Sequence, residues 1–213
     1  FKPLTPIHFK YQEVFNKLGF QIDLSKDHTY PTPKTLNNFE ITNNNPKVGI
    51  APFAKHIGKV YPLDLMQKII AYLSQNNQVF LFGFGDELKI LEKWKSSYKN
   101  VDCPSSNSNF KQEIELISNL DLMISMDSAN GHIASIYNVP VITIWGLTHP
   151  FTGFSTFNSI EENQFTVDRT KFPLIPTSIY GNKKIKGYED AMRSIDLNGL
   201  LFRADQILNQ TSS

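Results

Sequence analysis

The sequence is poor in the residues that support several common kinds of site. Cys103 is the only cysteine among 213 residues, which excludes an intrachain disulfide and a cysteine-based zinc site and favours a reducing compartment. No apolar run approaches the roughly 18 residues that a membrane span needs. The formal net charge is +1, which gives no sign of an acidic tail or of nucleic-acid binding. The chain also lacks a P-loop, a Gly-x-Ser-x-Gly motif and any metal-ligand spacing, so we expect no metal.

The composition of the first 46 residues is mostly typical of loops. Apolar residues at helical spacing in "IHFKYQEVFNKLGF" predict one helix that stops at Gly19. The following "SKDHTYPTPKTLNNFEITNNNP" is rich in Pro, Asn and Thr, which is typical of a linker. The chain begins without Met and without the layout of a signal peptide. We therefore expect residues 1–46 to be a lead-in helix and linker at the end of a missing N-terminal domain, and residues 47–213 to form the main domain.

From residue 47 onward, predicted strands alternate with predicted helices. The strands are "KVGIAPF", "QVFLFGF", "DLMISM" and "VPVITIWG", with "NVDC" and "QFTVD" as shorter candidates. Helical spacing marks "PLDLMQKIIAYLSQNN", "DELKILEKWKSSY" and "SNFKQEIELISNL", the last capped by Ser108 or Asn109, and "IDLNGLLFRADQIL" reads as a closing helix. Strands that are apolar on both faces indicate a parallel sheet with covered faces. This pattern predicts an α/β, Rossmann-like, doubly wound parallel sheet over about residues 47–150.

Four stretches of sequence fall where such a sheet would bind a ligand. In open α/β sheets, ligands lie at the carboxyl ends of the strands, near helix N-termini. At that edge we expect "PFAKHIGKVYP" (52–62), "GFGDE" (83–87), "MDSANGH" (126–132) and "WGLTHP" (145–150).

The stretch "MDSANGH" allows two interpretations. If the helix begins near Ser128, Asp127 is its N-cap, and His132 lies one turn further on the same side. The first-turn N–H groups, which suit an anion, come from residues without bulky side chains: Ser128, Ala129 and Asn130. One interpretation is a ligand site, with Asp127 capping the helix or holding a sugar hydroxyl. The other is an ordinary capped helix in which Gly131 permits close packing.

Two other stretches supply charged candidates. Lys59 could place its ammonium group over a diphosphate, with Lys55 and His56 as nearby alternatives. Asp86 or Glu87 could accept hydrogen bonds from ribose hydroxyls, or could simply cap the second helix. The preceding Gly-x-Gly lacks a third glycine and follows the second strand, so it is a weak sign of a dinucleotide or S-adenosylmethionine site.

These stretches together resemble a known family. "MDSANGHIASIYNVPVITIWGLTHPF" resembles the signature of glycosyltransferase family 9, the ADP-heptose:lipopolysaccharide heptosyltransferases and their relatives. "VGIAPFAKHIGKVYPLD" is similar to the first donor-domain segment of that family, and "FLFGFGDELKILEKW" to its glycine loop. The resemblance covers about residues 47–150 in order and extends more faintly to "PTSIYGNKKIKGYEDAMRSID" (176–196).

The resemblance implies a GT-B enzyme with two Rossmann-like halves, of which this chain would be the C-terminal, donor-binding half. Lys59 would then contact the donor phosphate, Asp86 or Glu87 the ribose, and Asp127 the sugar or diphosphate region. The diphosphate pocket would be completed by Ser128, Ala129 and His132. Such enzymes are inverting and usually need no metal, so no cofactor is expected.

The resemblance also implies the substrates. The donor would be a nucleotide-diphospho-sugar of the ADP-heptose type, and a lipopolysaccharide-type acceptor would bind the missing half. That half would also carry the acidic general base, so no catalytic residue is assigned here and the chain alone would be inactive. The expected location is cytoplasmic, peripheral to the inner face of the cytoplasmic membrane. Two alternatives stay open: half of a GT-B sugar-nucleotide epimerase, and a non-catalytic nucleotide-binding module.

Overall fold

The computed structural model describes residues 2–26, 28–36, 39 and 44–211. Its centre is one parallel sheet, whose strands stand in the order β3-β2-β1-β4-β5-β6. The strands are β1 (Lys47–Ala51), β2 (Gln78–Leu81), β3 (Val101–Asp102), β4 (Leu122–Met126), β5 (Val141–Ile144) and β6 (Gln164–Phe165). The predicted Rossmann-like parallel sheet is confirmed, including the two short strands.

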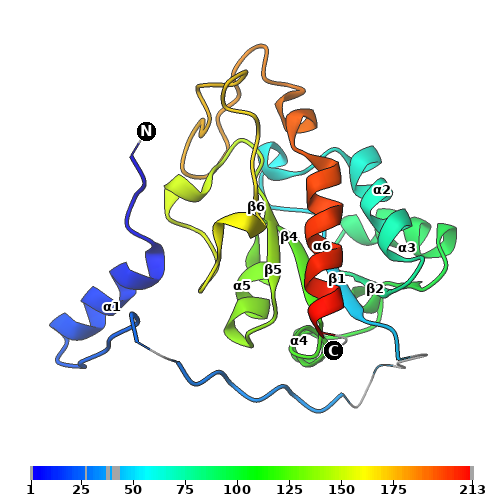
Figure 1. Cartoon of the computed structure of the whole chain (residues 1–213), viewed down its shortest axis with the longest axis horizontal. Coiled ribbons are helices and arrows are strands. Elements are labelled where there is room, and N and C mark those ends of the chain that lie inside the picture. Colours follow the sequence, from blue (N-terminus) through cyan, green and yellow to red (C-terminus); the bar gives the residue numbers. More distant parts are fainter. Residues whose placement is uncertain (1, 27, 37–38, 40–43, 212–213) are drawn as a thin grey trace.

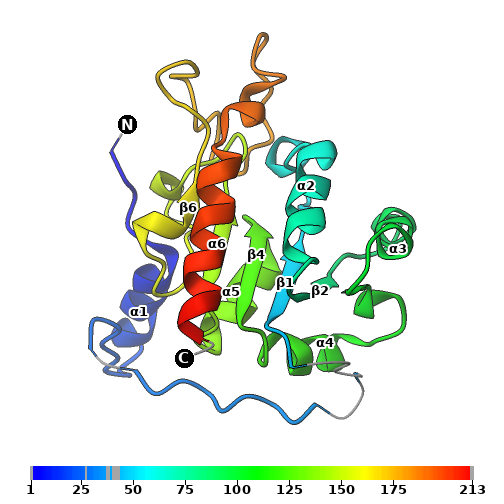
Figure 2. The same ribbon diagram turned by 45° about the vertical axis from the view of Figure 1, so that its right-hand side comes forward.

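Helices cover both faces of this sheet (Figures 1 and 2). One face carries α2 (Leu63–Leu73), α3 (Glu87–Ser97) and α6 (Leu197–Thr211), and the other carries α4 (Phe110–Ile117) and α5 (Ala129–Ile136). In α2 the buried side chains recur at helical spacing: Met66, Ile69, Ile70 and Leu73. The helices predicted within residues 47–213 are thus present, and α2 buries the face that its apolar pattern indicates.

Two apolar cores result, one on each face of the sheet. Neighbouring strand residues point to opposite faces, so Ile50 of β1 packs into one core and Ala51 into the other. Ile124 and Met123 of β4 divide in the same way. Because both faces are buried, the strands read as continuous apolar runs, and burial of this apolar surface is the main force that holds the layers together.

The structure identifies the N-cap of α4, which the sequence left open between Ser108 and Asn109. Asn109 is the N-cap, and its side-chain oxygen accepts from the N–H of Gln112 at 3.1 Å. The Gln112 side chain in turn accepts from the N–H of Asn109 at 2.9 Å, which completes a capping box.

The N-terminal segment lies against the domain rather than in it. Helix α1 (Ile7–Lys17) has no buried residue and ends before Gly19, whose φ is 93°. Backbone hydrogen bonds from Leu4 to Phe151 and from Ile7 to Gly153 tie the segment to the loop that follows β5. Residues 28–36 run as an extended segment below the sheet (Figure 1). The predicted helix is confirmed, and the division at residue 46 stays a prediction.

None of the helices within the described ranges is both long and apolar enough to cross a membrane.

Candidate functional site

The strand order places the candidate residues at one edge of the sheet. The order reverses between β1 and β4, which are direct neighbours, and the loops that leave their carboxyl ends therefore meet. The loop after β1 carries Lys59, and the residue after β4 is Asp127. The Nζ atom of Lys59 lies 2.5 Å from the Oδ2 atom of Asp127. Their side chains are 13% and 6% exposed, so this is a nearly buried, charge-assisted contact.

Three glycines allow the loops around Lys59 to pack backbone against backbone. A Cβ atom on Gly58 would overlap the carbonyl oxygen of Gly181, and one on Gly146 would overlap that of Gly58. Gly181 has a φ of 64°, and a Cβ atom there would lie 3.2 Å from Cγ of Lys59. The N–H of Leu147 donates to the carbonyl of Gly58 at 2.7 Å. The lysine stem is therefore held between the loops after β1 and β5 and the tail of the chain.

Helix α5 begins beside this ion pair. Its N-cap is Ser128, with extended backbone (φ −148°, ψ 171°) and no hydrogen bond from its side chain to the helix. The prediction that Asp127 is the N-cap, with the helix starting at Ser128, is wrong because the Asp127 carboxylate turns to Lys59 instead. The hydroxyl of Ser128 lies 3.1 Å from that of Ser125. Gly131 does permit close packing, since a Cβ atom there would lie 3.0 Å from Oγ of Ser125.

His132 lies behind the ion pair, where it faces a groove formed with the N-terminal segment. Burial lowers its pKa, the charge of Lys59 lowers it further, and Asp127 raises it in part. The groove has a volume of about 460 Å³, and His8 and His28 also line it. Burial and the proximity of His132 lower the pKa of His8 as well. The sequence offered no signal for this proximity, because residue 8 precedes the sheet.

The structure separates the two acidic residues of the glycine loop. Asp86 is the N-cap of α3, but its side chain is 95% exposed and pairs with Lys89 at 2.9 Å. Glu87 points back toward the loop, where its Oε2 atom accepts from the N–H of Phe84 at 2.8 Å. Glu87 also lines the adjacent cavity and Asp86 does not. The geometry therefore favours Glu87 as the acidic group that faces a ligand.

That cavity has a volume of about 700 Å³ and runs along the carboxyl ends of β1, β2 and β3. Its lining includes Phe53, Phe84, Ser105, Phe110, Glu113 and Asn130. Asn130 belongs to the first turn of α5, so the cavity extends to the helix start beside the ion pair. Residues 105–113 were not among the predicted site residues, although five of them line this cavity. The sequence could have predicted their position, because "PSSNSNF" follows the predicted strand "NVDC" and so lies at the same edge of the sheet.

A second cavity of about 490 Å³ lies on the other side of the lysine loop. It brings His56 together with the tail residues Lys184, Lys186 and Tyr188. Lys55 is exposed and lines neither this cavity nor the first. The tail, where the family resemblance is faint, thus forms one wall of the site region.

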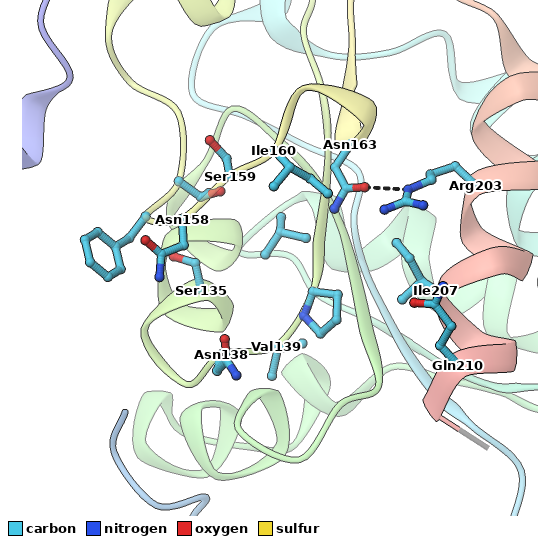
Figure 3. Close-up of a pocket in the computed structure, with 14 residues that line it drawn as sticks. Ser135, Asn138, Val139, Asn158, Ser159, Ile160, Asn163, Arg203, Ile207 and Gln210 are labelled. Carbon is cyan, nitrogen blue, oxygen red and sulfur yellow. Dashed lines mark hydrogen bonds between the residues drawn. The ribbon is translucent and has the colours of Figure 1, made fainter. Parts of the chain in front are cut away.

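A third cavity, drawn in Figure 3, lies away from this edge. It has a volume of about 300 Å³ and is lined by the end of α5, the start of β5 and helix α6. Asn163 accepts a hydrogen bond there from Nε of Arg203 at 2.7 Å (Figure 3). None of the predicted site residues lines it. Within the described ranges, no group of three His, Cys, Asp or Glu residues is arranged to hold a metal ion.

Comparison with solved structures shows the same fold in several glycosyltransferases. E. coli ADP-heptose LPS heptosyltransferase II aligns with a TM-score of 0.59 and 16% identity over 81% of this chain and 49% of that one. The family 9 glycosyl transferase from Veillonella parvula DSM 2008 gives 0.60 and 14% over 94% and 51%. E. coli heptosyltransferase WaaC with ADP gives 0.56 and 13% over 78% and 45%. This chain therefore spans about half the length of these structures.

A comparison with curated protein sequences gives no match. The family model described as glycosyltransferase family 9 (heptosyltransferase), in contrast, matches residues 8–173. This range includes all six strands of the sheet, β1 to β6, with the loops that carry Lys59, Glu87 and Asp127, and it extends into the N-terminal helix. The chain belongs to glycosyltransferase family 9, the heptosyltransferase family.

Proposed function

We propose that this chain is the donor-binding half of a glycosyltransferase and holds a nucleotide-diphospho-sugar. The observation that carries the proposal is the nearly buried Lys59–Asp127 pair, which lies at the point where the strand order reverses and beside the start of α5. The start of α5 lies beside this cationic group, and its residue Asn130 lines a cavity of about 700 Å³. That combination suits a ligand with a diphosphate at one end and a nucleoside at the other.

The ion pair leaves the lysine able to act on a phosphate. An ammonium group has three N–H donors, and only one is needed for Asp127, so two remain for diphosphate oxygens. Asp127 fixes the direction of the ammonium group and offsets its charge when the site is empty. As the glycosidic bond breaks, negative charge grows on the leaving diphosphate. The ammonium group and the first-turn N–H groups of α5, at Ala129 and beyond, would stabilise that charge.

The other contacts follow from the order of the strands. Glu87, at the end of β2, would accept hydrogen bonds from the ribose hydroxyls. His132, behind the pair, would support the diphosphate pocket in its neutral form, consistent with its lowered pKa. No metal or other cofactor is part of the proposal.

The identity of the donor and the acceptor is also proposed. WaaC, one of the structural neighbours, was solved with ADP, and another neighbour is an ADP-heptose LPS heptosyltransferase. By analogy we propose an ADP-linked, heptose-type donor and a lipopolysaccharide-type acceptor. The acceptor and the general base would belong to the remainder of the protein, which would work in the cytoplasm at the inner face of the membrane.

Calorimetric titration of this chain with ADP, UDP and GDP tests the proposal. We expect selective binding of ADP and a loss of roughly tenfold or more in affinity in Lys59→Ala, because a charge-assisted contact to phosphate is removed. Lys55→Ala is the matched control, since it removes an exposed lysine from the same loop. The proposal fails if no nucleotide binds, or if both variants bind ADP as tightly as the wild type.

A further inference from the structure

The nucleoside end of the cavity has a polar wall that the proposed function leaves unexplained. The loops at this edge follow the order of the strands: those after β4 and β1 carry the ion pair, the loop after β2 carries Glu87, and the loop after β3 carries Ser105. The cavity is lined by Asn130, at the start of α5 beside the ion pair, and by Glu87 and Ser105. Neighbouring strands are about 4.8 Å apart, so the distance from β4 to β3 is roughly 14 Å. An extended nucleoside diphosphate placed with its phosphates at Lys59 and its ribose at Glu87 therefore has its base at the ends of β2 and β3.

Two exposed phenylalanines frame this end of the cavity. Phe84, in the loop after β2, is 88% exposed, and Phe110, the first residue of α4, is 67% exposed. Both line the cavity. A flat base between the two rings would cover apolar surface on both sides.

Glu113 lies one helical turn after Phe110 and lines the same cavity. It is half-buried, and none of the ion pairs among the described residues includes it. Burial raises the pKa of its carboxyl, and a hydrogen bond with the Ser105 hydroxyl lowers it in part. A carboxylate in the first turn of α4 suits the helix dipole, and this one also borders the cavity.

Ser105 limits what Glu113 can recognise. The Ser105 hydroxyl accepts from the N–H of Gly83 at 3.3 Å, which leaves its own O–H to donate to Glu113. One carboxylate oxygen is thereby occupied, and the other remains available as an acceptor. The neighbouring Ser108 hydroxyl oxygen is buried and has no hydrogen-bond partner among the described residues. The acceptor that a ligand can reach here is therefore the second carboxylate oxygen of Glu113.

We infer that Glu113 accepts a hydrogen bond from the exocyclic amino group of the donor's base, held between Phe84 and Phe110. The inference rests on the proposed function, and it makes Glu113 the residue that selects a base with an amino group, as in adenine, over one without. A free carboxylate oxygen has no hydrogen to offer, so it favours a base that presents an N–H donor at that position.

A cycle that combines a protein variant with a ligand variant tests this contact. The two ligands are ADP and purine riboside 5′-diphosphate, which differs from ADP only in lacking the amino group. We expect the wild type to bind ADP roughly tenfold or more tightly than the analogue. In Glu113→Ala the affinity for ADP should fall to that for the analogue, whose own affinity should change little. Glu113→Gln should keep most of the preference, because its amide oxygen is still an acceptor.

Glu162→Ala is the control, since it removes an exposed glutamate outside the cavity and should leave both affinities unchanged. If Glu113→Ala does not fold, Glu113→Leu, which keeps the side-chain volume, takes its place. An equal preference for ADP in the wild type and in the Ala or Leu variant overturns the role of Glu113. If ADP binding then still depends on Lys59, the proposed function survives that result. Absence of any nucleotide binding by the wild type overturns both.

Discussion

The Nζ atom of Lys59 and the Oδ2 atom of Asp127 lie 2.5 Å apart, although the two residues are 68 positions apart in the chain. The contact joins the loops after β1 and β4, the two neighbouring strands between which the strand order reverses. Because both side chains are nearly buried, each one compensates a charge that would otherwise be left in an apolar environment. The pair is thus both a structural contact and the proposed diphosphate site.

Removal of one partner should destabilise the domain. Lys59→Met leaves the Asp127 carboxylate buried and unpaired, and we expect the free energy of unfolding in urea to fall by about 3 kcal/mol. The double variant Lys59→Met, Asp127→Leu removes both charges and should recover most of that loss. If the double variant were as unstable as the single one, the cost would come from lost packing and not from the unpaired charge.

Gly181 should be intolerant of a side chain for two separable reasons. Its φ of 64° disfavours any other residue, and a Cβ atom would lie 2.9 Å from Cγ2 of Thr148 and 3.2 Å from Cγ of Lys59. Gly187, with a φ of 86° and no atom within 4 Å of a Cβ, is the matched control. We expect Gly187→Ala to lose about 1 kcal/mol of unfolding free energy through backbone strain alone.

Gly181→Ala should lose more unfolding free energy than Gly187→Ala and should also weaken ADP binding, because the lysine stem is displaced. The measurements are urea unfolding and calorimetry on both variants. Equal losses of stability together with unchanged ADP affinity would show that the tail does not position Lys59.

The sequence predicts the strands and helices of this fold, but it predicts only some of the contacts between them. Apolar runs and helical spacing predict strands such as Leu122–Met126 and helices such as Leu63–Leu73 because burial follows those periods directly. Capping was ambiguous wherever several small polar residues stand together. The sequence favoured Asp127 as the N-cap of α5, whereas in the structure the helix begins one residue later and the Asp127 carboxylate contacts Lys59.

The candidate site shows the same limit. Lys59, Glu87 and Asp127 could be named because a parallel sheet brings the carboxyl ends of its strands to one edge. Glu113 could not be named from the sequence, because its proposed role depends on which side of α4 faces the cavity. Gly181 depends likewise on the path of a tail without regular structure around it. Contacts between loops that are far apart in the chain leave no periodic pattern in the sequence.

Glu87 and Asp86 should differ in their effect on ribose recognition. Glu87 lines the cavity and Asp86 pairs with Lys89 in solvent, so Glu87→Ala should weaken ADP binding by roughly tenfold while Asp86→Ala leaves it unchanged. Glu87 also accepts from the N–H of Phe84, and its removal could therefore act through the loop. Titration with 2′,3′-dideoxy-ADP separates the two effects. A ribose contact predicts that the deoxy ligand binds wild type and Glu87→Ala alike, whereas a loop effect weakens its binding to the variant.

His149 should make the stability of the domain depend on pH. Burial, and then the charge of Arg169, lower the pKa of this histidine to about 4, and its Nδ1 atom accepts from the N–H of Phe151 at 3.2 Å. The unfolded chain, with an ordinary histidine pKa near 6.5, binds the proton more readily than the folded one. The stabilising contribution is therefore present above about pH 6.5 and is lost as the pH falls toward about 4.

Over that window the shift corresponds to about 3 kcal/mol of unfolding free energy. His149→Asn removes the titrating group and keeps a side-chain acceptor for the Phe151 N–H, so it should flatten this part of the profile. The lowered pKa values of His8 and His132 act in the same direction, and the raised pKa of Glu113 acts in the opposite one. The quantity to measure is thus the difference between wild type and His149→Asn in urea unfolding from pH 7 to pH 4. A difference that stays constant with pH would mean that His149 takes up its proton in the folded protein as easily as in the unfolded chain.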